Sequence, residues 1–222
     1  FEKAIDDFTR IIDMYNNNNN TSSSQKSDEG SIAKDAQLLM LRSYMSRGNC
    51  HDSLNQFSDA VRDFDQFIHL FGTIDGENTE KSDEELMNSV SLYAAYHNRA
   101  YAYSAMSQEQ EAIDDFSRAI HQFETRVVNK EEMARKSSGS VSASATGGSS
   151  SSSAIVDTYF QRGKTYEMVD QVDRALEDYK SVIHYDANHA RCHFRLGQLA
   201  YVDQRYGDAV KSFDKVIEHS PS

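Results

Sequence analysis

The chain has 222 residues, a formal net charge of −12 and a hydrophobic share of 38%. An acidic chain of this kind is poorly suited to a nucleic-acid backbone, which requires clustered lysine and arginine. No apolar run approaches the roughly 20 residues of a membrane-spanning helix. Cys50 and Cys192 fall far apart, inside two predicted helices, which favours reduced thiols over a disulfide framework. We therefore expect a cytoplasmic protein that binds no nucleic acid and has no membrane span.

A short pattern recurs along the chain, in which alanine is followed four residues later by phenylalanine or tyrosine. Residues four apart share one face of a helix, so each copy predicts a helix with a small and an aromatic residue side by side. The last two copies are separated by 34 residues, and Gly163 and Gly197 recur at the same offset. A fixed period of this size indicates an array of helix-turn-helix repeats. The copies are Ala4/Phe8, Ala60/Phe64, Ala112/Phe116, Ala175/Tyr179 and Ala209/Phe213.

Helix signals place the individual elements in chain order. Gly72 is expected to end the helix that begins at Phe57, as glycine does just past a helix end. Ser82-Asp83-Glu84-Glu85 is a capping box, because the serine and the second glutamate can each bond a free backbone amide of the first turn. After a first helix within 1–15, the predicted helices span 33–52, 57–70, 82–106, 109–136, 154–168, 171–185, 188–202 and 206–219.

Three stretches interrupt the repeat period. Successive alanines of the pattern lie 56, 52, 63 and 34 residues apart, so the first three gaps contain extra residues. The Asn/Ser-rich tract Asn16 to Ser31 and the Ser/Gly-rich tract Ser137 to Ser153 contain too few apolar residues to order themselves. The middle stretch, Gly72 to Ser82, is shorter and acidic. We interpret all three as insertions between repeats.

The repeated residues resemble the tetratricopeptide repeat. That family has an aromatic residue near the start of each repeat, a small residue at position 8, alanine at 20, an aromatic at 24 and proline near 32, the place of Pro221. The small residues let two helix backbones approach, and the aromatic fills the space beside them. The resemblance implies an all-α fold, a right-handed α-solenoid of stacked helix-turn-helix repeats with low-complexity insertions between them.

This repeat frame divides the whole chain. Phe1 falls at position 17 of the repeat, so the first copy has only its second helix, and we expect the chain to be part of a longer protein. The predicted parts are 1–15, the second helix of a truncated first repeat; 16–31, an Asn/Ser-rich insertion; 32–71, repeat 2; 72–82, an acidic loop; 83–136, repeat 3 with extended helices; 137–153, a Ser/Gly-rich insertion; 154–187, repeat 4; and 188–222, repeat 5.

The sequence contains no catalytic signature, neither a phosphate-binding glycine loop nor a nucleophile motif, so we expect no enzymatic activity and no cofactor. His189, Cys192 and His193 could place three zinc ligands on one helical turn. No fourth ligand is evident, and His193 occupies a packing position of the repeat, so we favour a structural role. The aspartates beside the repeated alanine, Asp6-Asp7, Asp114-Asp115 and Asp178, are expected on a solvated convex face.

The resemblance implies a concave groove lined by the first helix of each repeat, which binds an extended peptide or a partner helix. Family positions 2, 5, 9 and 12 face that groove. The alternative is that these residues are simply a solvated helix face. The groove candidates are Arg42, Met45, Asn49, Asp52, Ala94, His97, Tyr101, Ser104, Asp157, Phe160, Lys164, Glu167, Arg191, Phe194, Gln198 and Tyr201, together with their neighbours Asn98 and Arg195.

A more specific possibility is the carboxylate clamp of some tetratricopeptide co-chaperones, which holds the C-terminal tail of a chaperone. Asn49 and Asn98 match the clamp in one register of repeats, and Arg191 and Arg195 match it in another. Asp157 stands where the clamp has a lysine, and an aspartate there would repel the carboxylate of the ligand. The chaperone-tail reading therefore rests on scattered matches, although the arginine pair could still bind an acidic group.

The sequence as a whole favours a non-catalytic protein-interaction scaffold whose partner is a peptide or helix held in the groove. One alternative is a regulatory or targeting domain of a larger enzyme or co-chaperone. Another is a structural spacer in a large assembly, which would bury helix edges instead of the groove.

Overall fold

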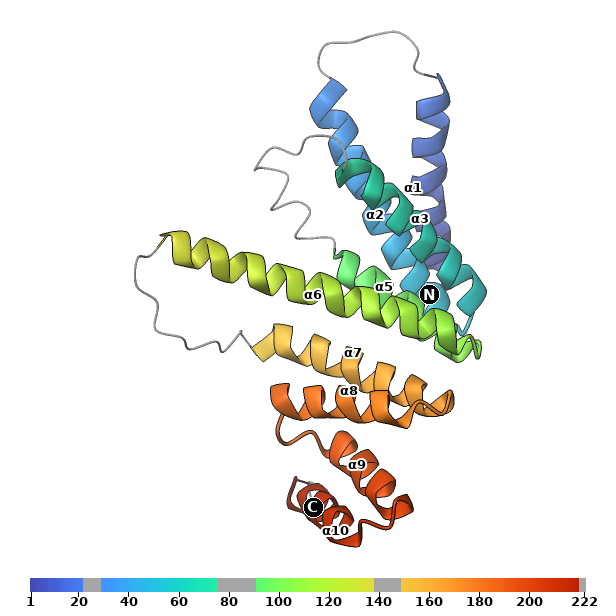
Figure 1. Cartoon of the computed structure of the whole chain (residues 1–222). Coiled ribbons are helices and arrows are strands. Elements are labelled where there is room, and N and C mark those ends of the chain that lie inside the picture. The colour runs from blue at the N-terminus through green and yellow to red at the C-terminus, as the bar shows by residue number, and fades with distance from the viewer. Residues whose placement is uncertain (22–28, 76–90, 138–148, 220–222) are drawn as a thin grey trace. The chain divides into compact units, whose positions relative to one another are not determined.

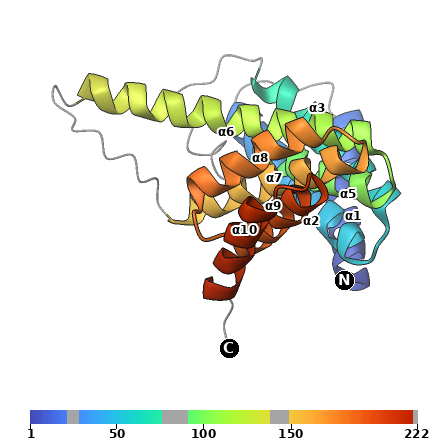
Figure 2. The same ribbon diagram turned by 60° about the horizontal axis from the view of Figure 1, so that its bottom comes forward.

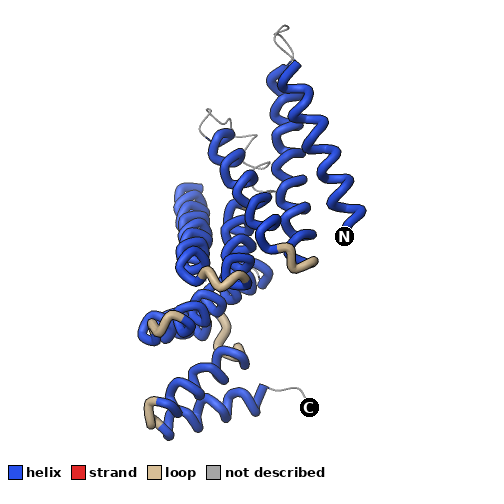
Figure 3. Tube along the Cα trace, turned by 90° about the vertical axis from the view of Figure 1, so that its right-hand side faces the viewer, coloured by secondary structure: helices blue, strands red, loops and turns tan. Residues whose placement is uncertain are grey.

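The computed structural model describes residues 1–21, 29–75, 91–137 and 149–219. Throughout these ranges the ordered elements are helices, and no strand occurs among them (Figure 3). The helices, labelled in Figure 1, are α1 (Glu2–Thr21), α2 (Glu29–Ser53), α3 (Phe57–Asp75), α5 (Leu92–Ala105), α6 (Glu109–Ser137), α7 (Ser149–Met168), α8 (Val172–Tyr185), α9 (Ala190–Val202) and α10 (Tyr206–His219). None of these helices is long and apolar enough to cross a membrane.

The helices extend into the tracts predicted as insertions. α1 continues to Thr21 and α2 begins at Glu29, so most of the Asn/Ser-rich stretch 16–31 is helical. α3 passes Gly72, and α7 begins at Ser149 inside the Ser/Gly-rich stretch. Once a packed segment has nucleated a helix, each further residue adds a backbone hydrogen bond at little cost, even where the side chains bury nothing.

The first helix of the third repeat also begins later than predicted. Its N-cap is Ser91, whose backbone is extended and whose side chain accepts a hydrogen bond of 3.4 Å from the amide of Ala94. α5 therefore starts at Leu92, and the predicted continuous helix from Ser82 to Met106 is wrong. The capping box itself, residues 82–85, lies outside the described residues.

The contacts group the helices into two compact units, 1–119 and 120–222, with the boundary inside α6. In the first unit α2 packs on both α1 and α3, and α3 packs on α5. In the second unit α7 pairs with α8, α9 pairs with α10, and α8 contacts α9. Figure 2 shows α7, α8, α9 and α10 following one another as neighbours in the second unit. The helical hairpin is thus the building block within each unit.

A small residue and an aromatic ring hold each hairpin together, as the repeat pattern predicts. In three hairpins a glycine of the first helix lies directly under the ring of the second helix, and a Cβ built on it would come within 2.6–2.8 Å of a ring carbon. Such a distance is far inside van der Waals contact, so only glycine allows this helix spacing. The pairs are Gly48/Phe64, Gly163/Tyr179 and Gly197/Phe213. In the remaining hairpin Ala100 and Phe116 are both buried.

The turn between the two helices has the same backbone conformation in every hairpin. One residue of each turn has φ between 57° and 60°, in the left-handed region, although none of these residues is glycine. The amide of the next residue then donates to the carbonyl five positions earlier at 2.8–2.9 Å, which satisfies an orphan carbonyl of the first helix. The left-handed residues are Asn55, Ser107, Asp170 and Gln204.

An ion pair inside each of three hairpins corrects a prediction made from the sequence. Asp115 and Asp178, expected on a solvated face, are 1% and 3% exposed. Each accepts two hydrogen bonds from an arginine that lies 16 residues earlier on the first helix, as Asp63 also does, at distances of 2.5–2.9 Å. The other aspartates of that prediction, Asp6, Asp7 and Asp114, are exposed, as expected. The pairs are Arg47/Asp63, Arg99/Asp115 and Arg162/Asp178.

Candidate functional site

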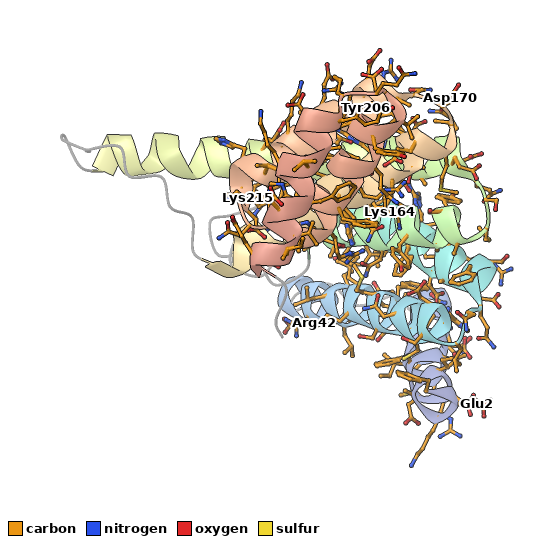
Figure 4. The ribbon with its side chains drawn as sticks, turned by 90° about the horizontal axis from the view of Figure 1, so that it is seen from below. Glu2, Arg42, Lys164, Asp170, Tyr206 and Lys215 are labelled. Carbon is orange, nitrogen blue, oxygen red and sulfur yellow. The ribbon has the colours of Figure 1, made fainter. Side chains whose placement is uncertain are left out.

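The second unit contains a hollow of about 440 Å³ between α7, α9 and α10. A volume of this size lies within the range of ligand sites in proteins. Lys164 of α7, which Figure 4 labels, lies on the wall of this hollow. The complete lining is Phe160, Lys164, Ala190, Arg191, Phe194, Arg195 and Val216.

Phe160 forms the apolar floor of the hollow. Its side chain is 2% exposed and packs against the rings of Tyr179 and His189, at centroid distances of 5.8 and 5.2 Å. The guanidinium of Arg191 lies over the Phe160 ring, 4.6 Å from its centroid. This cation–π contact keeps Arg191 beside the opening while its side chain stays exposed. Phe160 therefore shapes the hollow from below.

Phe194 is the aromatic residue that the hollow offers to a ligand. It lies on α9, one turn after Ala190, and its side chain is 46% exposed. Its ring also contacts the ring of Phe213, with centroids 5.9 Å apart, so the side chain is held by packing on one side. An exposed aromatic that is already fixed loses little conformational entropy when it binds, which suits it to anchor a partner.

The cations around the hollow differ in their availability. Arg195 donates to both carboxylate oxygens of Glu167, and a third donor contacts Gln198 at 3.0 Å. Burial acts to lower the pKa of Arg195, but the partner Glu167 outweighs it and the pKa is raised. Lys164 and Arg191 are exposed, and the ammonium of Lys164 is 3.5 Å from the amide oxygen of Gln161. Lys164 and Arg191 are therefore the cations that can reach an acidic group.

Glu167 ties three helices of the second unit together. It accepts from the hydroxyl of Tyr179 on α8 as well as from Arg195 on α9, while its own backbone belongs to α7. Burial raises the pKa of Tyr179, and the hydrogen bond to Glu167 raises it further. The network holds α9 against the α7–α8 hairpin and so fixes the width of the hollow.

The structure brings five of the predicted groove residues to this hollow. Asp157 lies one turn earlier on α7, where its carboxylate accepts a bond of 3.4 Å from Gln161. Gln198 contributes only through its bond to Arg195. The five are Phe160, Lys164, Arg191, Phe194 and Arg195.

The predicted groove residues of the first unit include an amide pair and an isolated carboxylate. The side chain of Asn98 on α5 donates to the side chain of Asn49 on α2 at 2.8 Å, which joins two successive first helices. Asp52, one turn after Asn49, has one buried carboxylate oxygen without a hydrogen-bond partner. Burial raises the pKa of Asp52. Arg42 and Tyr101 are exposed.

Two other candidates of the first unit act in packing. Met45 lies half-buried against the hydrophobic clusters around α2 and α3. The ring of His97 contacts those of Tyr93 and Phe116, with centroids 6.0 and 5.8 Å apart. These contacts favour a structural role for both residues.

The three potential zinc ligands are each used in another way. The imidazole of His189 caps α9 by accepting from the amide of Cys192 at 3.1 Å. The thiol of Cys192 donates to the carbonyl of Tyr179 at 3.4 Å, and burial raises its pKa to about 12. The Nε2 atom of His193 lies 2.8 Å from the carbonyl oxygen of Ala187. Within the described ranges no group of three or more His, Cys, Asp or Glu side chains could hold a metal ion. Cys50 and Cys192 are both free thiols.

Paired helices with a recurring turn, a recurring glycine–aromatic contact and a recurring ion pair define an all-α repeat protein of the solenoid class. Profiles of the tetratricopeptide repeat match residues 93–121 and 160–222. These two segments of the chain are tetratricopeptide repeats, which support a protein-interaction module in general. The repeat family is generally a non-catalytic interaction fold.

Solved structures of the same fold share little sequence with the chain. A crystal structure of MamA has a TM-score of 0.54 at 17% identity, covering 88% of this chain and 95% of MamA. A second MamA crystal structure gives 0.55 at 17% identity, covering 98% and 92%. BtubC from P. vanneervenii gives 0.58 at 12% identity, covering 98% of this chain and 72% of BtubC. No curated protein matches the sequence. At these identities the likeness concerns the fold.

Proposed function

We propose that the chain is a non-catalytic scaffold that binds a partner peptide in the hollow of its second unit. The observation that carries the proposal is the convergence of exposed cations and aromatic rings on one concavity of about 440 Å³. Phe160 and Lys164 come from α7, and Arg191 and Phe194 come from α9. A concave site with an apolar floor and a few polar groups is the usual form of a binding site.

The chemistry of the lining favours an acidic peptide with an apolar side chain next to the acid. Lys164 and Arg191 offer the charges, and Arg191 can bind a carboxylate through two parallel donors. Phe194 offers an exposed ring against which an apolar side chain can pack. Because the whole chain carries a net charge of −12, an acidic ligand is attracted only where these cations are concentrated.

A chaperone C-terminal tail is less well supported than an acidic peptide in general. Arg195, one of the two arginines that match the clamp, already donates to Glu167. Asp157, at another clamp position, brings a negative charge to the same helix as Lys164. A tail with two carboxylates would therefore meet one committed arginine and one repulsive aspartate.

Selection from a random peptide library on the purified chain, followed by fluorescence anisotropy, tests this proposal. We expect selected peptides to share aspartate or glutamate beside an apolar residue and to lose at least ten-fold in affinity for Arg191→Ala and for Phe194→Ala. Arg174→Ala is the matched control, since Arg174 is an exposed arginine of α8 away from the lining. Peptides that bind both variants as tightly as the wild type would refute the site.

A further inference from the structure

The outer face of α10 carries an apolar stripe with one acidic residue in its middle. Val210 and Ile217 are 58% and 73% exposed. Tyr206, which Figure 4 labels, lies on the same helix. It is 57% exposed. Asp214 lies between Val210 and Ile217 and is also exposed. The spacing of four and then three residues places Val210, Asp214 and Ile217 on one face of the helix.

Two helices at the equivalent place in other repeats have a similar stripe, formed by two apolar residues with a polar residue between them. In α3 it consists of Val61, Asp65 and Ile68, and in α1 of Ile5, Thr9 and Ile12. There the apolar residues are partly or fully buried, because α5 packs on α3 and α2 packs on α1. The stripe of α10 therefore has the composition of a surface that receives a helix, while its own apolar residues face solvent.

The helices that cover these stripes share an arginine at the point of contact. Arg99 of α5 donates to Asp65, and Arg47 of α2 donates to the hydroxyl of Thr9 at 3.0 Å. Asp214 occupies the same place on α10 as Asp65 on α3, midway between the two apolar residues. A helix bound to α10 would thus meet a carboxylate where an arginine is the matching partner.

Small residues flank that arginine. Ala95 and Ala102, four residues before and three after Arg99, are both fully buried. Ser43 and Cys50 hold the same places around Arg47. Small side chains allow a helix to lie close to the apolar stripe while its arginine reaches the polar residue between the apolar ones.

We infer that the stripe Val210–Asp214–Ile217 is a docking surface for an amphipathic helix of a partner protein, with arginine flanked by small residues four positions before and three after it. Apolar burial along the stripe supplies the attraction. The pairing of arginine with Asp214 sets the register and direction of the helix, because a shift by one residue would bring the charge against an apolar side chain. The surface is distinct from the hollow, whose α10 residue is Val216.

The chain itself supplies a probe with this chemistry, namely a peptide of residues 91–107, which contains Ala95, Arg99 and Ala102. Fluorescein-labelled peptide is titrated with the full 222-residue chain and followed by anisotropy. We expect saturable binding that Val210→Asp and Asp214→Asn each weaken at least ten-fold. Asp208→Asn is the control, since Asp208 is an exposed aspartate of the same helix outside the stripe. All substituted residues are exposed, so the variants should unfold at the wild-type temperature.

A charge exchange decides whether the arginine contact is specific. The peptide with Arg99→Asp should bind the wild type at least ten-fold more weakly and regain affinity for the Asp214→Arg variant. Absence of saturable binding, or binding unaffected by Val210→Asp, overturns the proposal. It is equally overturned if sedimentation shows a dimer that Val210→Asp dissociates, because the stripe would then be an interface between two copies of this chain.

Discussion

Arg99 of α5 donates to Asp115 of α6 through two hydrogen bonds of 2.5 and 2.8 Å, and its remaining terminal nitrogen donates to Asp65 of α3. One guanidinium therefore closes its own hairpin and joins that hairpin to the preceding one. The arginine is 12% exposed and Asp115 is 1% exposed. Burial acts to lower the pKa of Arg99, but the two aspartates outweigh it and the pKa is raised. Arg99 stays charged in the folded protein.

The equivalent pair in the second unit, Arg162 and Asp178, predicts a large effect of breaking one partner. Asp178→Ala leaves the guanidinium of Arg162 without its carboxylate at a place where both side chains are largely buried. We expect the free energy of unfolding to fall by about 3 kcal/mol, as when one member of a buried ion pair is removed. Chemical denaturation followed by circular dichroism measures the change.

Two further variants test the reason for that loss. Asp173→Ala removes an exposed aspartate from the same helix and should change the free energy of unfolding by less than about 0.5 kcal/mol. The double variant Arg162→Met/Asp178→Leu removes both charges and should recover much of the stability, because no unpaired charge remains. An Asp178→Ala variant as stable as the control would show that the pair contributes nothing.

The contact of Gly163 with Tyr179 predicts that a single methyl group disturbs the α7–α8 hairpin. In Gly163→Ala the new Cβ would lie 2.8 Å from Cε1 of Tyr179, and the ring is itself buried and cannot move away. We expect a loss of about 1–3 kcal/mol in the free energy of unfolding, the usual result of overpacking. Thermal or chemical unfolding measures it.

Gly207→Ala is the matched comparison for that substitution. Gly207 lies in the first turn of α10, and a Cβ there has no neighbour within 4 Å. Alanine favours a helix over glycine, so this variant should be as stable as the wild type or more stable by up to about 1 kcal/mol. Similar losses at both glycines would contradict the packing argument.

The left-handed turns predict a stabilising change to glycine. Gln204 has a φ of 59°, a conformation that costs a residue with a Cβ roughly 1–2 kcal/mol. Gln204→Gly removes that strain but adds freedom to the unfolded chain, so we expect a net gain of a few tenths of a kcal/mol to about 1 kcal/mol. Lys211→Gly, inside α10, should instead lose about 1 kcal/mol. Thermal unfolding should therefore show a higher unfolding temperature for Gln204→Gly and a lower one for Lys211→Gly than for the wild type.

The buried oxygen of Asp52 predicts a pH-dependent gain in stability for Asp52→Asn. Burial raises the pKa of Asp52 in the folded protein above its unfolded value, so the ionised side chain weakens the fold at pH above the folded pKa. The amide removes that charge, and we expect a gain of about 1 kcal/mol at pH 7. Below the unfolded pKa both states of the wild type are protonated, and the gain should vanish.

Unfolding temperatures of both proteins, measured between pH 7 and pH 3, test this sign. Their difference should stay constant down to the folded pKa of Asp52 and then narrow as the pH falls towards the unfolded pKa. A difference that stays constant over the whole range would show that titration of Asp52 is not its cause.

The amino-acid sequence alone was enough to establish the repeat. Its pattern placed a small residue such as Gly163 and an aromatic such as Tyr179 at fixed positions of a helical hairpin, where the first lets the two helices approach and the second fills the space beside them. Five helices (α3, α6, α8, α9 and α10) begin within two residues of their predicted positions, whereas α5 begins ten residues later and α7 five residues earlier than predicted, and Gly72 does not end α3. Such features are local, since periodicity and turn chemistry act within one hairpin.

Only the tertiary structure decided which polar residues are buried and which cations remain available. Asp114 and Asp115 are adjacent and identical, yet only Asp115 faces an arginine 16 residues earlier, because neighbouring residues point about 100° apart on a helix. Arg191 and Arg195 share one face of α9, yet only Arg195 reaches Glu167. In each case the partner side chain comes from another helix, and the distance between the two side chains depends on how the helices pack.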